Sequence, residues 1–380
     1  MASDIWRAPV NRRDFLRGSA ALGLGGAAAF IAACGGTNPI AGASPTPINY
    51  PKAQIDGDLE YFNYAEYLSP DVIKGFEKNY GVKVHQTYFD NMSGLVAKIN
   101  SGNAYDLTFP TMDFVDQLVK GNALLPIDHT QLDHWSEVPS YFNNPWYDPH
   151  ALYSVPYAMW TTGICWRADK IPDAMEGSWN DIWTLAPKYS KKFFLLDDLQ
   201  EVLGMSLLRL GYDINSGKRD ELDKAVEEVL KIKPYLRNWV SDEIPGLVDG
   251  SVWFSHAWSG DVYQVVSQAS KPEVYRYETA KEGVPTGNDT FVIPKNAKHP
   301  GTALKFIDWL LAPENATTNV GYFGYPQVTT TGLAAFQKLV VQYPFLNISL
   351  DTAIHGLREI IPTGAKLQLW DLEWRKVKAG

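Results

Sequence analysis

The chain has 380 residues, with 34 Lys and Arg against 43 Asp and Glu, and a formal net charge of −9 at pH 7. This acidic balance argues against nucleic acid as a partner and has the sign that suits cationic ligands. The length exceeds what one hydrophobic core usually supports, so the sequence predicts two lobes.

The N-terminus carries the signature of an exported protein. A twin arginine at residues 12 and 13 precedes a Gly/Ala-rich apolar run, which ends in "IAAC" with Cys34. This order is typical of a Tat-type export signal with a lipobox. The apolar run over residues 18–33 is too short and too rich in glycine for a stable membrane span. We expect residues 1–33 to be a cleaved lipoprotein signal peptide and Cys34 to be lipidated; the alternative is a short anchor helix that stays uncleaved.

The segment after Cys34 is rich in Pro, Ala, Ser and Thr and shows no apolar periodicity. Such a composition is typical of a tether. Residues 34–55 are therefore predicted to hold a monomeric body at the outer face of a cell membrane.

The body begins with alternating strands and helices. Strands are predicted at 59–64, 82–89 and 105–110, and helices at 70–80, 92–102 and 113–122, with Ser69 and Pro70 starting the first helix. This alternation indicates a parallel α/β sheet, in which ligands bind beyond the carboxyl ends of the strands. That rule places residues 63–67, 89–91 and 110–113 along one rim.

A second unit of strands and helices is predicted from Trp160 onward. Strands are expected at 162–167, 191–198 and 252–258, helices at 178–187, 199–212 and 218–232, and then a crossing strand at 289–294 and a helix at 300–313. We assign residues 56–160 and 290–334 to lobe 1, and residues 161–289 and 335–380 to lobe 2. A cleft between two such lobes is a common ligand site.

Several stretches resemble, in sequence order, the periplasmic substrate-binding proteins of polyamine ABC transporters, the spermidine/putrescine-binding type. They are "YFNYAEYLSPDVIKGFEKNYGVKV", "AYDLTFPTMDFVDQLVKGNALLPID", "YSVPY", "LLDDLQEVLGMSLLRLGY", "AWSGDVY", "DTFVIPKNAK", "FGYPQ" and "KVKAG". The resemblance implies an α/β, two-lobed type II periplasmic-binding-protein fold with a ligand cleft between the lobes. It also implies capture of a polyamine of the putrescine or spermidine class by lobe closure, delivery to a membrane permease, and no cofactor or metal.

The same resemblance implies the ligand-binding residues. The opening motif of the family falls on Tyr64, Ala65, Glu66 and Tyr67, and the further positions fall on Thr111, Asp198, Glu201, Trp258, Asp289 and Tyr325. These residue types suit a polyamine, because carboxylates pair with its ammonium groups while aromatic faces cover its methylene segments.

Three positions depart from the family pattern. Asp113 stands where the family often has a tyrosine, and Gly287 stands where it commonly has a second tryptophan. Arg375 stands near a glutamine that often contacts the ligand. Either Asp113 and Arg375 pair with each other, or Arg375 receives a carboxylate and the solute is a zwitterionic amine.

Each candidate residue also has a structural interpretation. Asp198 can cap the helix that starts at Leu199, with Glu201 as its third residue. Large aromatic residues such as Trp258 and Tyr325 are frequent in cores. Asp289 can be a solvated strand start, and the two tyrosines of the opening motif can pack at the helix entry while its glutamate stays in solvent.

Two other classes of protein remain as alternatives. Paired acids between aromatic walls also describe a secreted glycosidase. However, the sequence has no Gly-x-Ser-x-Gly elbow and no His-x-x-x-His metal spacing. A lipoprotein that presents its bound solute to a membrane sensor would have the same sequence features as a transport protein.

Overall fold

The structure is a computed structural model of the chain, and it describes residues 48–89, 91–172, 175–360 and 364–379. The chain divides into two units, Met1–Ile48 and Asn49–Gly380, and all the elements below belong to the second. The predicted signal peptide, Cys34 and most of the tether lie outside the described residues. Within the described ranges, no helix is long and apolar enough to cross a membrane.

The first part of the body alternates strands and helices as predicted, and then runs through short 3-10 turns into a long strand. Its elements are β1 (Leu59–Asn63), α2 (Pro70–Tyr80), β2 (Val84–Tyr88), α3 (Met92–Asn100), β3 (Leu107–Thr108), α4 (Met112–Lys120), the turns His129–Gln131, Trp135–Glu137, Ser140–Phe142 and Pro149–Ala151, and β4 (Ser154–Arg167).

The second part repeats the alternation and ends in a group of helices. Its elements are α5 (Asn180–Lys188), β5 (Phe193–Leu196), α6 (Leu199–Arg209), α7 (Arg219–Ile232), the turn Lys233–Tyr235, β6 (Asn238–Val240), α8 (Ile244–Val248), β7 (Phe254–Trp258), α9 (Ser259–Gln268), the turn Pro272–Val274, β8 (Tyr275–Glu278), β9 (Pro285–Val292), α10 (Pro300–Leu311), α11 (Pro313–Phe323), α12 (Thr330–Gln342), α13 (Leu350–His355), β10 (Leu357–Arg358) and α14 (Ala365–Ala379).

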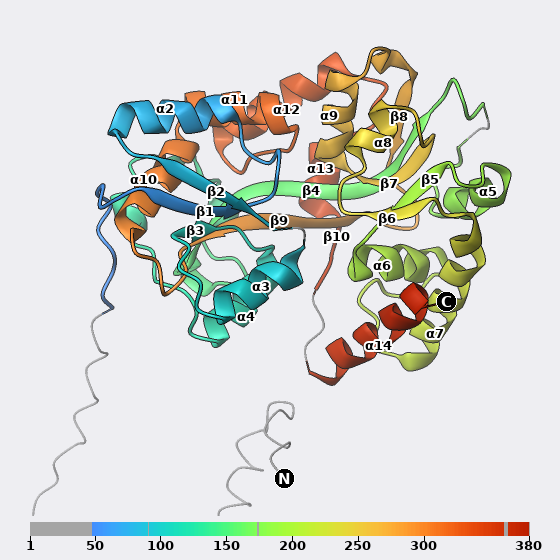
Figure 1. Cartoon of the computed structure of the whole chain (residues 1–380), viewed down its shortest axis with the longest axis horizontal. Coiled ribbons are helices and arrows are strands. Elements are labelled where there is room, and N and C mark those ends of the chain that lie inside the picture. The colour runs from blue at the N-terminus through green and yellow to red at the C-terminus, as the bar shows by residue number, and fades with distance from the viewer. Residues whose placement is uncertain (1–47, 90, 173–174, 361–363, 380) are drawn as a thin grey trace, which may run out of the picture. The chain divides into compact units, whose positions relative to one another are not determined.

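The strands form one hydrogen-bonded path in the order β2-β1-β3-β9-β4-β7-β5-β6. β1 runs parallel to β2 and β3, and β5 runs parallel to β6 and β7. We call β1, β2 and β3 the first strand group and β5, β6 and β7 the second strand group. Helices cover both faces of the sheet (Figure 1), which is the arrangement expected of parallel strands buried on both sides.

The two groups are joined by an antiparallel pair of strands, β4 and β9. β4 pairs with β9 through its first half and then with β7 and β8 on its two opposite edges, because Ile164, Cys165 and Trp166 each have a partner on both strands. Of its 14 residues, 13 are buried. The sequence predicted a new unit at Trp160 and a crossing strand from residue 289. The structure differs, because β4 is continuous from Ser154 and β9 already begins at Pro285.

Three buried apolar clusters support the sheet. One lies around the first strand group, and two lie around the second. Phe336 and Leu339 of α12 belong to the first cluster, although the sequence placed them in lobe 2. Ala53, near the end of the predicted tether, is hydrogen-bonded to the body. Its backbone N–H donates to the Gln131 side-chain oxygen. The boundaries of the lobes and of the tether stay predictions.

The loop after β1 is held by a buried polar network around Asn319 of α11. The Asn319 side-chain oxygen accepts from the backbone N–H of Ser69 at 2.9 Å. Its amide donates to Tyr157 Oη at 2.9 Å and to Gln327 Oε1 at 3.0 Å. Ser69 itself caps α2 by accepting from Asp71 N at 3.3 Å, as the sequence predicted. One asparagine therefore ties the first strand group, β4 and α11 together.

We expect Asn319→Ala to lower the free energy of unfolding by about 2–4 kcal/mol, because several buried polar partners would each lose a hydrogen bond. Urea unfolding followed by circular dichroism measures the change. Thr318→Ala, at an exposed position of the same helix, is the control and should stay within about 0.5 kcal/mol of the parent chain. Equal stability of the two variants would contradict this role of Asn319.

Candidate functional site

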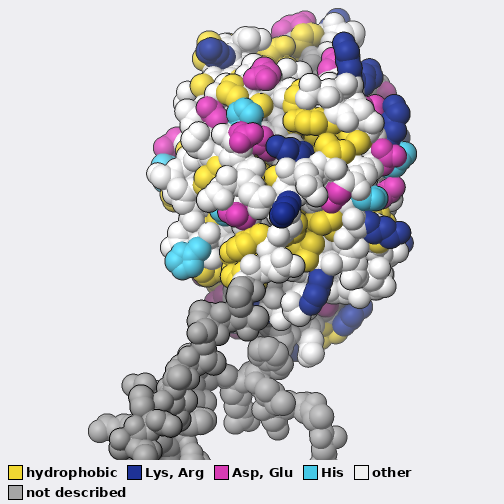
Figure 2. Space-filling view, turned by 90° about the vertical axis from the view of Figure 1, so that its left-hand side faces the viewer, with side chains coloured by type: hydrophobic (Ala, Val, Ile, Leu, Met, Phe, Trp, Pro, Cys, Tyr) yellow, Lys and Arg dark blue, Asp and Glu magenta, His cyan; other side chains and the backbone are white. Residues whose placement is uncertain are grey.

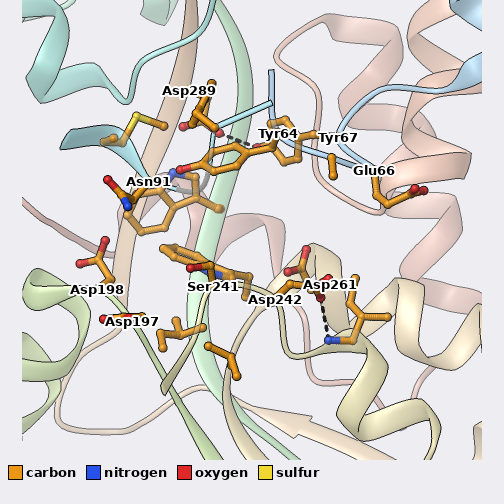
Figure 3. Close-up of a pocket in the computed structure, with 18 of the residues that line it drawn as sticks. Tyr64, Glu66, Tyr67, Asn91, Asp197, Asp198, Ser241, Asp242, Asp261 and Asp289 are labelled. Carbon is orange, nitrogen blue, oxygen red and sulfur yellow. Dashed lines mark hydrogen bonds between the residues drawn. The ribbon is translucent and has the colours of Figure 1, made fainter. Parts of the chain in front are cut away.

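A cavity of about 300 Å³ lies where the carboxyl ends of the two strand groups face each other. The loops after β1, β3, β5 and β6, the start of α3, the end of β7 and the helix α9 all contribute lining residues. Figure 3 shows Tyr64, Tyr67 and Asp289 on one side of this space and Asp198, Asp242 and Asp261 on the other. The rim position predicted for residues 63–67 is thus part of a cleft.

The cleft lining carries charge of one sign. Its described lining residues include no lysine or arginine, but they include six carboxylates: Glu66, Asp197, Asp198, Asp242, Asp261 and Asp289. On the face shown in Figure 2, by contrast, acidic and basic side chains of the described residues are interspersed. Acidic side chains are therefore concentrated in the cleft, whereas on this face they are mixed with basic ones.

Aromatic rings stand between these carboxylates. Tyr67 contacts Tyr325 edge to face, with ring centroids 5.2 Å apart, and Tyr64 contacts Tyr67 in the same way at 5.9 Å. Trp160 of β4 meets Trp258 at 5.0 Å with an interplanar angle of 85°. All five rings line the cavity. The lining thus combines carboxylates with aromatic rings.

Two of the carboxylates are held by tyrosine hydroxyls. Tyr67 Oη donates to Asp289 Oδ2 at 2.5 Å, and Tyr325 Oη donates to Asp261 Oδ1 at 2.6 Å. Burial raises the pKa of Asp289 to about 7, although hydrogen bonds from Tyr67 and Trp160 act in the opposite direction. Burial likewise raises the pKa of Asp261 to about 7. A cation that enters the cleft would therefore stabilise the charged form of both carboxylates.

Asp198 combines the two roles that the sequence left open. It is the N-cap of α6, because its Oδ1 accepts from Gln200 N at 2.8 Å and from Glu201 N at 3.2 Å. It also lines the cavity. Burial and the nearby charge of Glu201 raise the pKa of Asp198 to about 6, while the two backbone hydrogen bonds lower it. The same carboxylate therefore caps α6 and lines the cleft.

The opening motif bends sharply at the cleft. Glu66 has φ of +58°, in the left-handed region that non-glycine residues seldom adopt. Its carboxylate accepts a short hydrogen bond from the Tyr322 hydroxyl. Tyr67 is buried and Glu66 exposed, yet both line the cavity together with Tyr64 and Ala65. This segment therefore agrees with both interpretations: Tyr67 packs in the interior, and the motif also lines the cavity.

Nine of the twelve predicted ligand-binding residues line the cavity, and three do not: Asp113, Glu201 and Arg375. Asp113 is buried at the start of α4 and accepts from Thr111 Oγ1 at 2.8 Å. Glu201 is fully buried and accepts from Thr162 Oγ1 at 2.7 Å, with His256 Nε2 at 3.3 Å. Arg375 is exposed, because α14 buries Trp370, Glu373 and Val377 instead.

The sequence analysis missed several cleft residues, among them the carboxylates of Asp197, Asp242 and Asp261 and the ring of Trp160. Asp242 follows β6, and Asp261 lies in the first turn of α9, which begins where β7 ends, so the rule about carboxyl ends of strands could have found them. β6 has only three residues, which hid this position. For Trp160, which lies inside an apolar strand, the only signal was the glycine at residue 287.

A further missed residue, Glu359, is buried and does not belong to the cleft lining. It is 6% exposed, and its Oε1 has no hydrogen-bond partner among the described residues. Burial raises its pKa well above the usual range, and the charges of Glu201, Asp198 and Asp113 add to this. These four carboxylates therefore share one region. Among the described residues, no group of three or more His, Cys, Asp and Glu side chains is arranged to hold a metal ion.

Comparison with known proteins places this cleft in context. The profile of the family described as "Bacterial extracellular solute-binding protein" matches residues 71–343. The chain is 30% identical over 351 residues to the spermidine/putrescine-binding periplasmic protein of Escherichia coli strain K12, covering 90% of this chain and 97% of that protein. It is 28% identical to the putrescine/agmatine-binding protein of Pseudomonas aeruginosa, covering 85% and 92% of the two chains.

A solved structure has a similar fold. It comes from Listeria monocytogenes, and its name assigns it to a spermidine/putrescine ABC transporter. The two structures superpose with a TM-score of 0.77 at 27% sequence identity, over 85% of this chain and 99% of the other. The similarity therefore extends over almost the entire described body.

We expect the stability of the empty protein to fall as the pH rises from about 5.5 to 8. The folded-state pKa values of Asp198, Asp261 and Asp289 are raised above about 4, so the folded state binds more protons than the unfolded state in this window. Asp289 alone accounts for about 2 kcal/mol of this loss, by the relation between pKa and free energy.

Urea unfolding at both pH values, on the parent chain and on Asp289→Asn, measures this contribution. The variant should lose less stability over the window than the parent chain does. Glu314→Gln, at an exposed position of α11, is the control and should keep the parent dependence. An unchanged pH dependence in Asp289→Asn would show that Asp289 titrates normally.

Proposed function

Because the chain belongs to the bacterial extracellular solute-binding protein family, we propose that it captures a polyamine outside the cytoplasm and delivers it to the membrane permease of an ABC importer. The solute class is that of putrescine and spermidine: putrescine appears in the names of both similar proteins, and spermidine in the name of one. The protein acts by binding and release and not by catalysis.

One observation carries this proposal: six carboxylates and six aromatic rings line a cavity whose described residues include no lysine or arginine. A polyamine is a flexible chain of methylene groups with ammonium groups at intervals. Each ammonium can pair with a carboxylate, and each methylene segment can lie against a ring. The presence of both acids and rings in the cleft matches the two kinds of group in such a ligand.

The energetics require that the ligand be enclosed. Micromolar affinity corresponds to about 8 kcal/mol, whereas an exposed ion pair contributes about 0–1 kcal/mol. Cation–π contacts reach about 2 kcal/mol when water is excluded. Closure of the two strand groups over the ligand removes that water, so capture proceeds by closure. β4 and β9 are the connections about which such a movement would take place.

The zwitterionic solute is the less favoured alternative. It required a cationic side chain in the cleft, but Arg375 is exposed on α14 and is not among the lining residues. Presentation of the solute to a sensor uses the same cleft and differs only in the membrane partner. A glycosidase is not proposed, because the family is one of solute-binding proteins.

The anchoring and the assembly state complete the proposal. Tat-type export and lipidation of Cys34 would hold the body, as a monomer, at the outer face of the membrane. The support for this anchoring is the sequence motif alone, and Cys34 lies outside the described residues. Mass spectrometry of the exported protein would detect the lipid on Cys34.

Calorimetric titration of the body from residue 49 tests the proposed solute class. We expect one-to-one binding of putrescine, spermidine or spermine, and no binding of γ-aminobutyrate. Asp289→Asn and Asp198→Asn should each weaken the affinity about tenfold or more, because each removes a buried partner of an ammonium group. The control Glu314→Gln should bind as the parent does. Absence of polyamine binding to the parent chain would overturn the proposal.

Polyamine affinity should rise with pH between 5.5 and 8. At the lower pH, Asp289 and Asp261 are largely protonated, since the pKa of each is about 7, and they must release protons before they can pair with an ammonium group. Titration in buffers of different ionisation enthalpy should therefore show net proton release at pH 6.5. Proton uptake, or an affinity that falls with pH, would contradict this assignment of charge.

A further inference from the structure

Trp160 and Gly287 face each other across the pair of strands that joins the two groups. They are direct partners in the antiparallel ladder between β4 and β9, so their side chains project from the same face of the sheet. A β-carbon on Gly287 would lie 2.4 Å from Cζ2 and 2.8 Å from Cε2 of Trp160. The indole ring therefore occupies the space that any side chain at position 287 would need.

The indole ring of Trp160 forms part of the cleft wall. Trp160 is only 6% exposed and lines the cavity, and it meets Trp258 at nearly a right angle with centroids 5.0 Å apart. Asp289 lies two residues after Gly287 on β9, so its side chain projects from the same face. The carboxylate of Asp289 and the two perpendicular indole rings of Trp160 and Trp258 thus line one space, which we call the frame.

This frame has the chemistry of a subsite for an alkylammonium group. The carboxylate of Asp289 pairs with the ammonium, and the two indole faces cover the neighbouring methylenes and accept cation–π contacts, for which tryptophan is the strongest partner. A neutral or anionic group at this place would leave the buried carboxylate without a cation. The frame therefore favours an unbranched, charged end or segment of the solute.

We propose that Trp160 is a specificity-determining ligand contact, and that Gly287 is required because only glycine leaves room for its ring. This inference rests on the proposed function and extends it to one subsite, in which Trp160, Trp258 and Asp289 hold an alkylammonium segment. An exchange of the two residues, which would move the ring from β4 to the facing position on β9, would keep one ring on this wall of the cleft.

A set of four variants tests the exchange by calorimetry with spermidine. Trp160→Ala should weaken binding about 10- to 30-fold, since it removes one desolvated cation–π contact and the cover of a methylene segment. Trp160→Phe should lie between Trp160→Ala and the parent chain. Gly287→Trp alone should also weaken binding, because two rings would compete for one space. The double variant Trp160→Gly/Gly287→Trp should recover to within about fivefold of the parent, because it restores one ring on the same face.

Trp146→Ala is the matched control, because Trp146 is 44% exposed and does not line the cleft. Thermal unfolding of each variant identifies any that fails to fold, and Trp160→Phe, which keeps an aromatic ring in the site, carries the test if Trp160→Ala does not fold. Parent-like affinity in both Trp160 variants would overturn the inference while leaving the proposed function intact. A double variant no better than Gly287→Trp would overturn the exchange. A parent chain that binds no polyamine would overturn the proposed function itself.

Discussion

The antiparallel ladder between β4 and β9 is the interaction on which the rest of the structure depends. Every hydrogen-bonded route from the first strand group to the second passes through these two strands. The same ladder fixes the register that brings Trp160 opposite Gly287 and sets Asp289 opposite Ala158. A shift of one residue would turn all these side chains to the other face of the sheet. The pairing that joins the two halves of the body is therefore also the pairing that builds the floor of the cleft.

The cleft itself is a compromise between burial and charge. Rings such as Tyr67 and Trp160 exclude water and so raise the pKa of the carboxylates beside them. Tyrosine hydroxyls return part of the lost solvation by donating to Asp289 and Asp261. Protonation relieves the remaining cost in the empty protein, and a bound cation would relieve it more fully. Affinity and empty-state instability thus have the same physical origin.

Much of the fold could be predicted from the sequence, because it follows local rules. The alternation of strands and helices, the Ser69 cap and the end of α2 at Gly81 depend on neighbouring residues, and the structure confirms them. The comparisons confirm the family and the two-lobed type II fold class that the resemblance implied. The continuity of β4 could not be predicted, since a buried crossing strand has no alternating pattern to mark its ends.

The candidate site could be predicted from the sequence to a similar extent as the fold. Residues at the carboxyl ends of predicted strands, such as Tyr64 and Asp198, lie at the cleft as expected. Arg375 was placed by a short C-terminal match alone, and the structure puts it on the exposed side of α14. Trp160 and Glu359 depend on contacts with residues more than 100 positions away. Such contacts leave no local trace, so the sequence could point to them only through an unexpected residue such as Gly287.

The concentration of carboxylates in the cleft also has a kinetic consequence. Charges of one sign at the mouth of a low-dielectric cavity focus the electric field outward, which draws in cations faster than random diffusion would deliver them. This attraction is screened by salt over about 8 Å at physiological ionic strength. The rate at which the protein meets a scarce polycation would then depend on the salinity of its surroundings, even where the final affinity is set by the rings and carboxylates deep in the cleft.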